Sequence, residues 1–323
     1  MKSFARRIAV LGVAVVAAAT MLLAGCSQGG GGVSGSSGLQ GQVQQLGSAL
    51  SYLSSTLTDD GSGASTATSG ELKVRYIDVG QGDCTLVSCG GEYLMIDGGP
   101  SKQSNEVYSI LERMGVSHLD YVIATHPDAD HIGGLAGALN YATCGTFYSS
   151  VTQHDTKTFA NVVKYLGDTP ITVPQVGDFF YLGDAVVTFV GPVESYDDDT
   201  NNNSLVCRID YGSTSFLFTG DAEQESESDM VKSGVNIEAD VLKVGHHGSS
   251  SSTSKTFLDA VSPTYAVISV GADNSYGHPT SKTLSRLEKA GVEVYRTDEL
   301  GSVIAVSDGS TITFGHTTDK VSD

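Results

Sequence analysis

Positive charge is scarce in this sequence. Its 323 residues include 18 Lys and Arg against 37 Asp and Glu, which gives a formal net charge of −19 at pH 7. Tight, sequence-independent binding of nucleic acid depends on basic patches, so no strong affinity for nucleic acid is expected. A nuclease is not excluded, because a bound divalent metal would reverse the local field where a phosphate lies.

Cysteine is also scarce, and its five residues show none of the close spacing of a metal-binding motif. Cys84 and Cys89 flank a predicted strand that would hold them roughly 16 Å apart, too far for a disulfide. We interpret the four cysteines after Cys26 as small buried residues or an undetermined pair, and not as catalysts: Cys84, Cys89, Cys144 and Cys207.

Two common catalytic motifs are missing. No Ser/His/Asp triad is recognisable in the sequence. The glycine pairs Gly98-Gly99 and Gly133-Gly134 lack the spacing and the lysine of a phosphate-binding P-loop. Catalysis by a Ser/His/Asp triad and phosphate binding by a P-loop are therefore not expected.

The N-terminus has the pattern of an export signal. An apolar stretch over residues 8–23, short for a bilayer, follows three basic residues and ends in Leu-Ala-Gly-Cys26. This ending resembles the lipobox of bacterial lipoproteins, whose cysteine is acylated and becomes the first mature residue. We predict a signal peptide over 1–25, a lipid anchor on Cys26, a Gly/Ser-rich tether over 26–70 and one catalytic domain over 71–323. An uncleaved anchor is the alternative, and both place the domain outside the cytoplasm.

The predicted domain alternates short β-rich runs with helical stretches. Strands are expected at 74–78, 85–87, 92–96, 121–125, 186–190, 205–211, 215–219, 241–244, 266–270, 292–296, 302–306 and 311–314. Helices are expected at 105–114, 132–141 and 281–290. This mixed order predicts an α/β fold with two sheets and helices outside.

Acids and imidazoles gather where the strand at 121–125 ends. The run 126–131 reads His-Pro-Asp-Ala-Asp-His. The proline favours an extended backbone at His126, so His126, Asp128 and Asp130 can converge with His131. Carboxylates this close repel each other and imidazoles need oriented partners, so the density indicates a bound cation rather than a solvated turn.

Two later strands end in residues of the same kind. The strand at 215–219 is followed by Asp221, and the strand at 241–244 is followed by His246 and His247. Each alone is typical of a turn or of a surface position. Together with the run 126–131 they form a set of ligands suited to two divalent ions.

Six ordered motifs now resemble the metallo-β-lactamase superfamily, and most of all the metallohydrolase domain of ComEC-type competence proteins. They cover Ile77 to Asp83, Met95 to Gly99, Thr125 to Gly134, Thr219 to Asp221, Gly245 to Ser249 and Ser275 to Pro279. The resemblance implies an αββα sandwich, the metallo-β-lactamase fold, with two mixed sheets flanked by helices.

The resemblance also assigns roles by position. His126 and Asp128 would belong to a first metal, Asp130 and His131 to a second, and Asp221 would bridge the two. One of His246 and His247 would complete the second site, and the sequence does not decide which. His278, in the motif that also holds Tyr276, resembles a late active-site histidine that holds a phosphate oxygen or protonates a leaving group; a structural turn histidine is the alternative.

Two departures from the wider superfamily concern the first site. Asp128 stands where lactamases have His, and Asn203-Ser204 stands where the usual third His is missing, as in ComEC-type sequences. These changes make the first site richer in oxygen, so both zinc and manganese remain candidates.

Four polar residues in glycine-rich turns are expected to fix loop shape through backbone hydrogen bonds, rather than to contact metal directly. They are Asp78, Gln81, Asp83 and Asp97.

The expected function is that of an extracytoplasmic, membrane-anchored hydrolase with two divalent ions, Zn or Mn. A metal-activated water would attack a phosphodiester, since the resembling domain is implicated in DNA degradation, and Asp130 or Asp221 would orient the nucleophile. Alternatives are a cell-envelope phosphorylcholine esterase, a lactonase or β-lactamase, or a binding lipoprotein with a degenerate site.

Overall fold

The computed structural model describes residues 70–317. The predicted signal peptide, Cys26 and the tether lie outside the described residues, so they stay predictions. Within residues 70–317, no helix combines the length and the apolarity needed to cross a bilayer.

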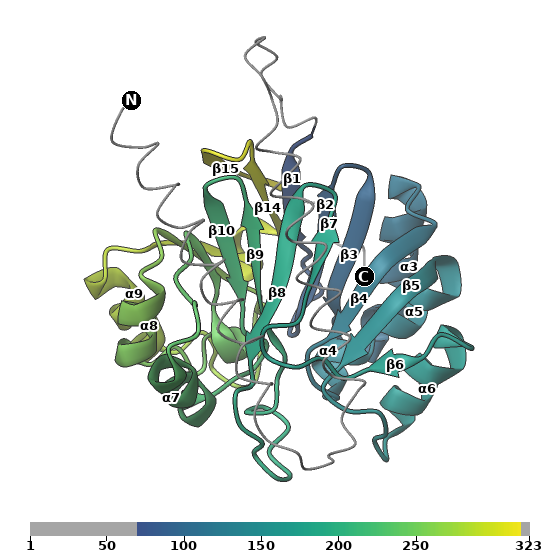
Figure 1. The fold of residues 1–323 in the computed structure, drawn as a ribbon, viewed down its shortest axis with the longest axis horizontal. Coiled ribbons are helices and arrows are strands. Elements are labelled where there is room, and N and C mark those ends of the chain that lie inside the picture. The colour runs from purple at the N-terminus through teal and green to yellow at the C-terminus, as the bar shows by residue number, and fades with distance from the viewer. Residues whose placement is uncertain (1–69, 318–323) are drawn as a thin grey trace, which may run out of the picture. The chain divides into compact units, whose positions relative to one another are not determined.

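The described residues form two sheets packed face to face, with helices on both outer sides (Figure 1). The first sheet has the strand order β15-β14-β1-β2-β3-β4-β5-β6. Its strands are β1 (Leu72–Tyr76), β2 (Cys84–Cys89), β3 (Glu92–Gly98), β4 (His118–Ala124), β5 (Thr143–Ser149), β6 (Ile171–Thr172), β14 (Ser302–Ser307) and β15 (Ile312–Thr317).

The second sheet has the order β13-β12-β11-β10-β9-β8-β7. Its strands are β7 (Phe179–Leu182), β8 (Ala185–Gly191), β9 (Val206–Tyr211), β10 (Thr214–Phe218), β11 (Val241–Lys243), β12 (Tyr265–Ile268) and β13 (Glu293–Arg296). Both sheets mix parallel and antiparallel pairs.

Helices cover the outer face of each sheet. The first sheet carries α3 (Ser104–Met114), α5 (Leu135–Tyr141) and α6 (Lys157–Leu166), and the second carries α7 (Gln224–Ser233), α8 (Lys255–Val261) and α9 (Ser281–Lys289) (Figure 1). Short segments complete the set: η2 (Ser101–Gln103), α4 (Ala129–Ile132), η3 (Gly245–Gly248) and α10 (Thr297–Leu300). The predicted αββα sandwich is confirmed.

Three apolar layers result from the alternation of side chains along the strands. In β10, Phe216 and Phe218 enter the core between the two sheets, while Leu217 enters the core under the helices of the second sheet. In β3, Leu94 and Ile96 likewise face the other sheet, and Met95, the residue between them, faces the helices of the first. Both sheets are therefore buried on two faces.

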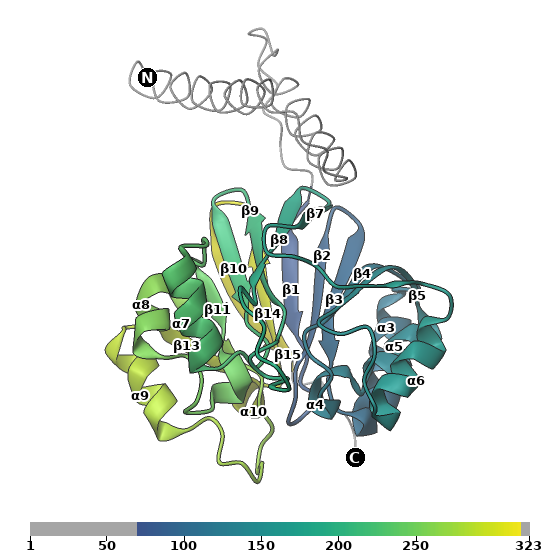
Figure 2. The same ribbon diagram turned by 60° about the horizontal axis from the view of Figure 1, so that its bottom comes forward.

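The parallel strands place their carboxyl ends at one rim of the sandwich. In the first sheet β3, β4 and β5 run parallel, and in the second β10, β11, β12 and β13 do. Figure 2 shows α4, which follows β4, at the end of the seam between the sheets. The loops after β4, β10 and β11 carry the three ligand motifs predicted from the sequence.

The predicted helix at 132–141 is two helices, α4 and α5, divided at Gly133 and Gly134. A side chain at Gly134 would place a Cβ 1.9 Å from the carbonyl oxygen of Gly98, and one at Gly133 would meet the amide of Ser101 at 2.2 Å. The two glycines therefore permit a close approach of backbone to backbone, which anchors the ligand loop on β3.

All four cysteines of the described part are free thiols. Cys84 and Cys89 lie at the two ends of β2, which agrees with the prediction that no disulfide joins them. Cys84, Cys89 and Cys207 are buried among apolar side chains, as expected of packing residues.

Candidate metal centre

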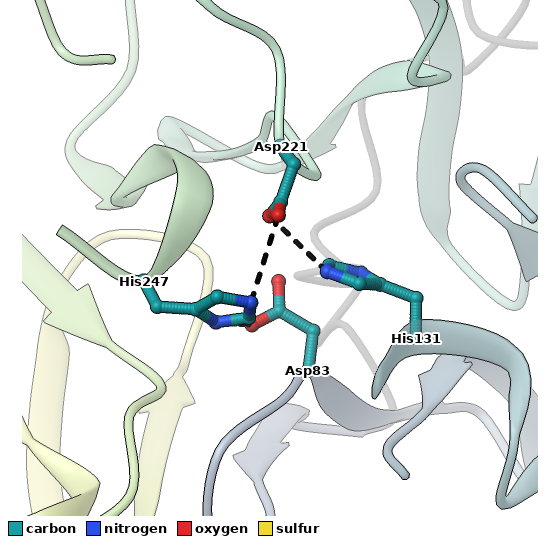
Figure 3. Close-up of side chains that lie close together, drawn as sticks. All are labelled: Asp83, His131, Asp221 and His247. Carbon is teal, nitrogen blue, oxygen red and sulfur yellow. Dashed lines mark ion pairs between the residues drawn. The ribbon is translucent and has the colours of Figure 1, made fainter. Parts of the chain in front are cut away.

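Four buried side chains meet at the rim of the sandwich. One ligand atom from each of Asp83, His131, Asp221 and His247 lies within 4.8 Å of the others (Figure 3). Nε2 of His131 is 3.2 Å from Oδ1 of Asp221, and Nε2 of His247 is 3.6 Å from Oδ2 of Asp221. The first sheet supplies Asp83 and His131 through its loops, and the second supplies the other two.

Fixed outer partners orient these imidazoles. Nδ1 of His247 lies 2.9 Å from the carbonyl oxygen of Ser269, which can only accept, so Nδ1 carries the proton. Nδ1 of His131 lies 2.8 Å from Oδ2 of Asp97, a carboxylate that also accepts from Thr125. Both rings therefore present the lone pair of Nε2 to the cluster, the arrangement of metal-binding histidines.

His126 and His246 repeat this arrangement beside the cluster. Nδ1 of His126 lies 3.1 Å from the hydroxyl of Thr125, and Nδ1 of His246 lies 3.0 Å from Oε1 of Glu223. The ring centroids of His126 and His131 are 4.1 Å apart, and Nε2 of His246 is 3.6 Å from Oδ2 of Asp221. Four imidazoles from two segments of the chain, one after β4 and one after β11, thus surround one region.

Several buried polar atoms of the site lack hydrogen-bond partners. Nε2 of His126, His131 and His247 and Oδ1 of Asp83 and Asp221 are all buried without a hydrogen bond. Lone pairs that face one another in a buried site are costly unless a cation or protons lie between them. The residues therefore fit divalent metal.

Protons replace the cation when no metal is bound. Burial alone would lower the pKa of His247, but Asp221 and Asp83 outweigh it and raise this pKa to about 9. The pKa of His131 is likewise raised, against burial, by Asp221 and Asp97. The pKa of Asp221 is lowered, again against burial, by His131 and His247. The cluster thus stabilises positive charge.

Asp128 and Asp130 lie at the open side of the site. Their side chains are 43% and 36% exposed, against 0% for His126. Oδ2 of Asp128 is 3.9 Å from Nε2 of His126, and Oδ2 of Asp130 is 3.3 Å from Nε2 of His247. The structure therefore brings together the members predicted for each metal.

The adjacent histidines differ in burial. Both adopt a left-handed backbone, with φ of 48° at His246 and 51° at His247. His247 is buried in the cluster, whereas the side chain of His246 is 24% exposed. The ring of His278 lies 5.6 Å from that of His246, and Tyr276 beside it is 69% exposed. His247 is accordingly the better ligand, and His246 and His278 border the open side.

The turn residues mostly hold loops, as predicted. Asp78 accepts a hydrogen bond from the amide of Gly80, and Gln81 accepts one from the amide of Gly271. Asp97 orients the ligand His131 as described above. Asp83 lies within the cluster itself, where its Oδ1 is 3.2 Å from Nδ1 of His247.

Ser204, rather than Asn203, contacts the first site. Oγ of Ser204 lies 3.3 Å from Nδ1 of His126 and accepts a hydrogen bond from the amide of Asp221. The side chain of Asn203 bonds to its own loop, at the amide of Tyr196 and the carbonyl of Asp199. Of the predicted pair Asn203-Ser204, Ser204 thus contacts His126, while Asn203 shapes the loop that carries it.

Four supporting residues were not singled out from the sequence. Thr125, Glu223 and Ser269 hold the outer nitrogens of ligand histidines, and Lys243 forms an ion pair with Asp83. Only Lys243 left a signal, since a lysine inside the apolar strand before the histidine pair needs a buried partner.

The family follows from comparison with known proteins. A family model described as "Metallo-beta-lactamase superfamily" matches residues 77–272. The chain belongs to this superfamily. The matched range contains every residue of the cluster.

The curated relatives are competence proteins of the ComEC type. The chain is 32% identical over 255 residues to ComE operon protein 3 of Bacillus subtilis, a match that covers 73% of this chain and 33% of that protein. It is 33% identical over 235 residues to competence protein ComA of Neisseria gonorrhoeae, covering 72% and 32%. The chain spans about a third of the length of these relatives.

Among solved structures, the metallo-beta-lactamase fold protein YhfI of Bacillus subtilis aligns with a TM-score of 0.47 and 17% identity, covering 69% of this chain and 96% of that one. The family model and the curated relatives, together with the buried cluster, make the chain a superfamily hydrolase related to competence proteins, with a candidate metal site.

Metal binding should change the pH dependence of stability. The raised pKa of His247 stabilises the metal-free fold fully below about pH 6.5, and this contribution is lost as pH rises through about 9. Metal displaces those protons, so the rise in Tm on adding Mn²⁺ or Zn²⁺ should grow from pH 6 to pH 9. The lowered pKa of Asp221 contributes stability that is constant above about pH 4 and is lost only in stronger acid, so it does not vary between pH 6 and pH 9.

Thermal unfolding with EDTA and with metal measures this difference. His247→Gln should flatten the metal-free curve over this window, and His154→Gln, at a histidine outside the cluster, should leave it unchanged. A metal-induced shift that is the same at pH 6 and pH 9 would contradict the assignment.

Proposed function

We propose that this chain is a metal-dependent phosphodiesterase with two divalent ions, Zn or Mn. The observation that carries the proposal is the convergence of four imidazole Nε2 atoms with the carboxylates of Asp128, Asp130 and Asp221 at one rim of the fold. Such a set of nitrogen and oxygen ligands suits two borderline divalent ions.

Ligand assignment follows the distances. His126 and Asp128 would hold the first ion, and Asp130, His131 and His247 the second, with Asp221 between them. When bound, the ions supply Lewis acidity, a lowered pKa for a bound water, and positive charge for the transition state. The oxygen-rich first pair suits manganese as well as zinc.

The chain's own residues then orient the reactants. Asp130 is a half-exposed carboxylate at the open side, suited to orient the attacking water and accept its proton. Burial, together with His246, lowers the pKa of His278, so this imidazole is neutral at pH 7. A neutral ring that donates its N–H to a phosphate oxygen fits this state better than a proton donor to the leaving group.

Replacement of the shared carboxylate tests the metal-dependent reaction. Asp221→Asn should lower kcat/KM for bis-p-nitrophenyl phosphate by at least about 1000-fold, near 4 kcal/mol of transition-state stabilisation, and reduce the bound metal. Asp259→Asn, on the exposed face of α8, is the matched control. Wild-type protein without divalent metal, or full activity in Asp221→Asn, would refute the proposal, and nitrocefin turnover instead would assign it to the β-lactamases.

We further propose that the enzyme acts outside the cytoplasm, held to the membrane by a lipid on Cys26. The lipobox-like sequence before Cys26 supports this placement. Mass spectrometry of the protein from its native cell should find Cys26 acylated at the mature N-terminus. An unmodified Cys26 would remove the anchor from the proposal.

A second candidate is an esterase for small phosphodiesters of the cell envelope, such as phosphorylcholine esters. Two cavities of about 470 and 390 Å³ share Ser150, Ser195 and Asn203, and the smaller is also lined by Pro127, next to the site. Their linings include Glu194, Asp197 and Asp198 but no Lys or Arg. A nucleic-acid strand in these cavities would bring its phosphates against carboxylates.

Charge reversal separates the two substrates. Asp197→Lys/Asp198→Lys should raise kcat/KM for single-stranded DNA about tenfold at low salt, because repulsion becomes attraction, and leave bis-p-nitrophenyl phosphate unchanged. Asp168→Lys/Glu238→Lys changes the net charge equally at exposed positions outside both cavity linings. Equal gains in both double variants would mean that overall charge, and not the cavities, disfavours DNA.

A further inference from the structure

Lys243 is the one Lys or Arg side chain that is buried within residues 70–317. It is the last residue of β11, and its side chain is 2% exposed. Its Nζ lies 2.8 Å from Oδ2 of Asp83 and donates a hydrogen bond to the carbonyl oxygen of Val244. A buried ammonium is stable only with such partners, so the ion pair joins the two sheets beside the metal cluster.

Asp83 connects this ammonium to a ligand histidine. Its Oδ1 lies 3.2 Å from Nδ1 of His247, and its Oδ2 is taken by Lys243. Burial alone would raise the pKa of Asp83, but Lys243 and His247 lower it, so the carboxylate is charged. Asp83 therefore lies between an ammonium and the outer edge of a ligand ring.

Two roles are open to this carboxylate. Its position within 4.8 Å of the ligand atoms of His131, Asp221 and His247 would allow it to bind metal. Its contacts instead lead away from that role, because one oxygen faces Lys243 and the other faces the Nδ1 edge of His247. Nε2, the opposite nitrogen of that ring, lies 3.3 Å from Asp130 at the open side.

We infer that Lys243 is a positioning residue of the metal centre. Its ammonium holds Asp83 against the Nδ1 edge of His247, keeps Asp83 from becoming a metal ligand, and leaves Nε2 of His247 for the ion. The inference rests on the metal-binding part of the proposed function and not on its substrate.

The charges of the site agree with this role. Six carboxylates lie in or next to it: Asp83, Asp97, Asp128, Asp130, Asp221 and Glu223. Two divalent ions and one ammonium would offset five of these six negative charges. Without Lys243 a further carboxylate, Asp83, would be uncompensated at a place where it can reach an ion.

Metal titration of single and double variants tests the role of Lys243. The probe is Co²⁺, whose visible absorption reports its set of ligands. Lys243→Met should bind Co²⁺ about tenfold more tightly with a changed spectrum, because the freed Asp83 joins the ligands, and its kcat should fall. Asp83→Asn should bind about tenfold more weakly, because an unpaired ammonium then repels the ion.

The double variant Asp83→Asn/Lys243→Met should return to within about threefold of the wild-type affinity, since both charges are absent. Lys289→Met, on the exposed end of α9, controls for net charge and should bind Co²⁺ as the wild type does. A purely structural ion pair would lower Tm in both single variants and leave Co²⁺ affinity and spectrum unchanged, which would overturn the inference.

The double variant keeps the test decisive if Lys243→Met alone does not fold. If Lys243→Met does not fold, the double variant must still bind Co²⁺ about tenfold more tightly than Asp83→Asn, and equal affinities, or a double variant that also fails to fold, would overturn the inference. Wild-type protein that binds Co²⁺ but cleaves no phosphodiester would end the proposed function and leave the role of Lys243 standing. Wild-type protein that binds no Co²⁺ would end both.

Discussion

The buried concentration of lone pairs between the two sheets is the constraint on which the rest of the site depends. Carboxylates and imidazole nitrogens that point at one another in a low-dielectric environment need positive charge among them. The surrounding residues are arranged for that charge, because Asp97, Ser269 and Glu223 hold the outer nitrogens of three histidines. Outer partners of this kind are typical of metal-binding histidines, and a solvated acidic turn would need none.

Much of this arrangement could be predicted from the sequence. The runs that end in His126, Asp221 and His246 are apolar and short, and parallel strands that end together place their following residues at one rim. The region from β5 to β7 was not predicted. Its strand Thr143–Ser149 is rich in small and polar residues and leaves little pattern. Its helix Lys157–Leu166 does carry apolar residues at helical spacing between the N-cap Thr156 and Gly167, so it could have been predicted. Helix Gln224–Ser233 has few apolar residues and leaves only a weak pattern.

Within the site, the sequence could not predict the direction in which individual side chains point. Sequence order could not tell which of His246 and His247 turns inward, because the answer depends on two consecutive left-handed residues. Sequence order also could not show that Ser204 contacts His126, whereas the adjacent Asn203 bonds within its own loop. Contacts across the sheets, such as Lys243 with Asp83, join residues far apart in the chain and leave only a weak local signal.

The position of the ligands across both halves of the fold has a mechanical consequence. His131 follows strand β4 of the first sheet, and Asp221 and His247 follow strands β10 and β11 of the second. A cation held by these three residues would be a cross-link that closes a long loop of chain, as a disulfide does. The four cysteines of the described part form no such bond. In this domain, a metal bound for catalysis would therefore also hold the two sheets together.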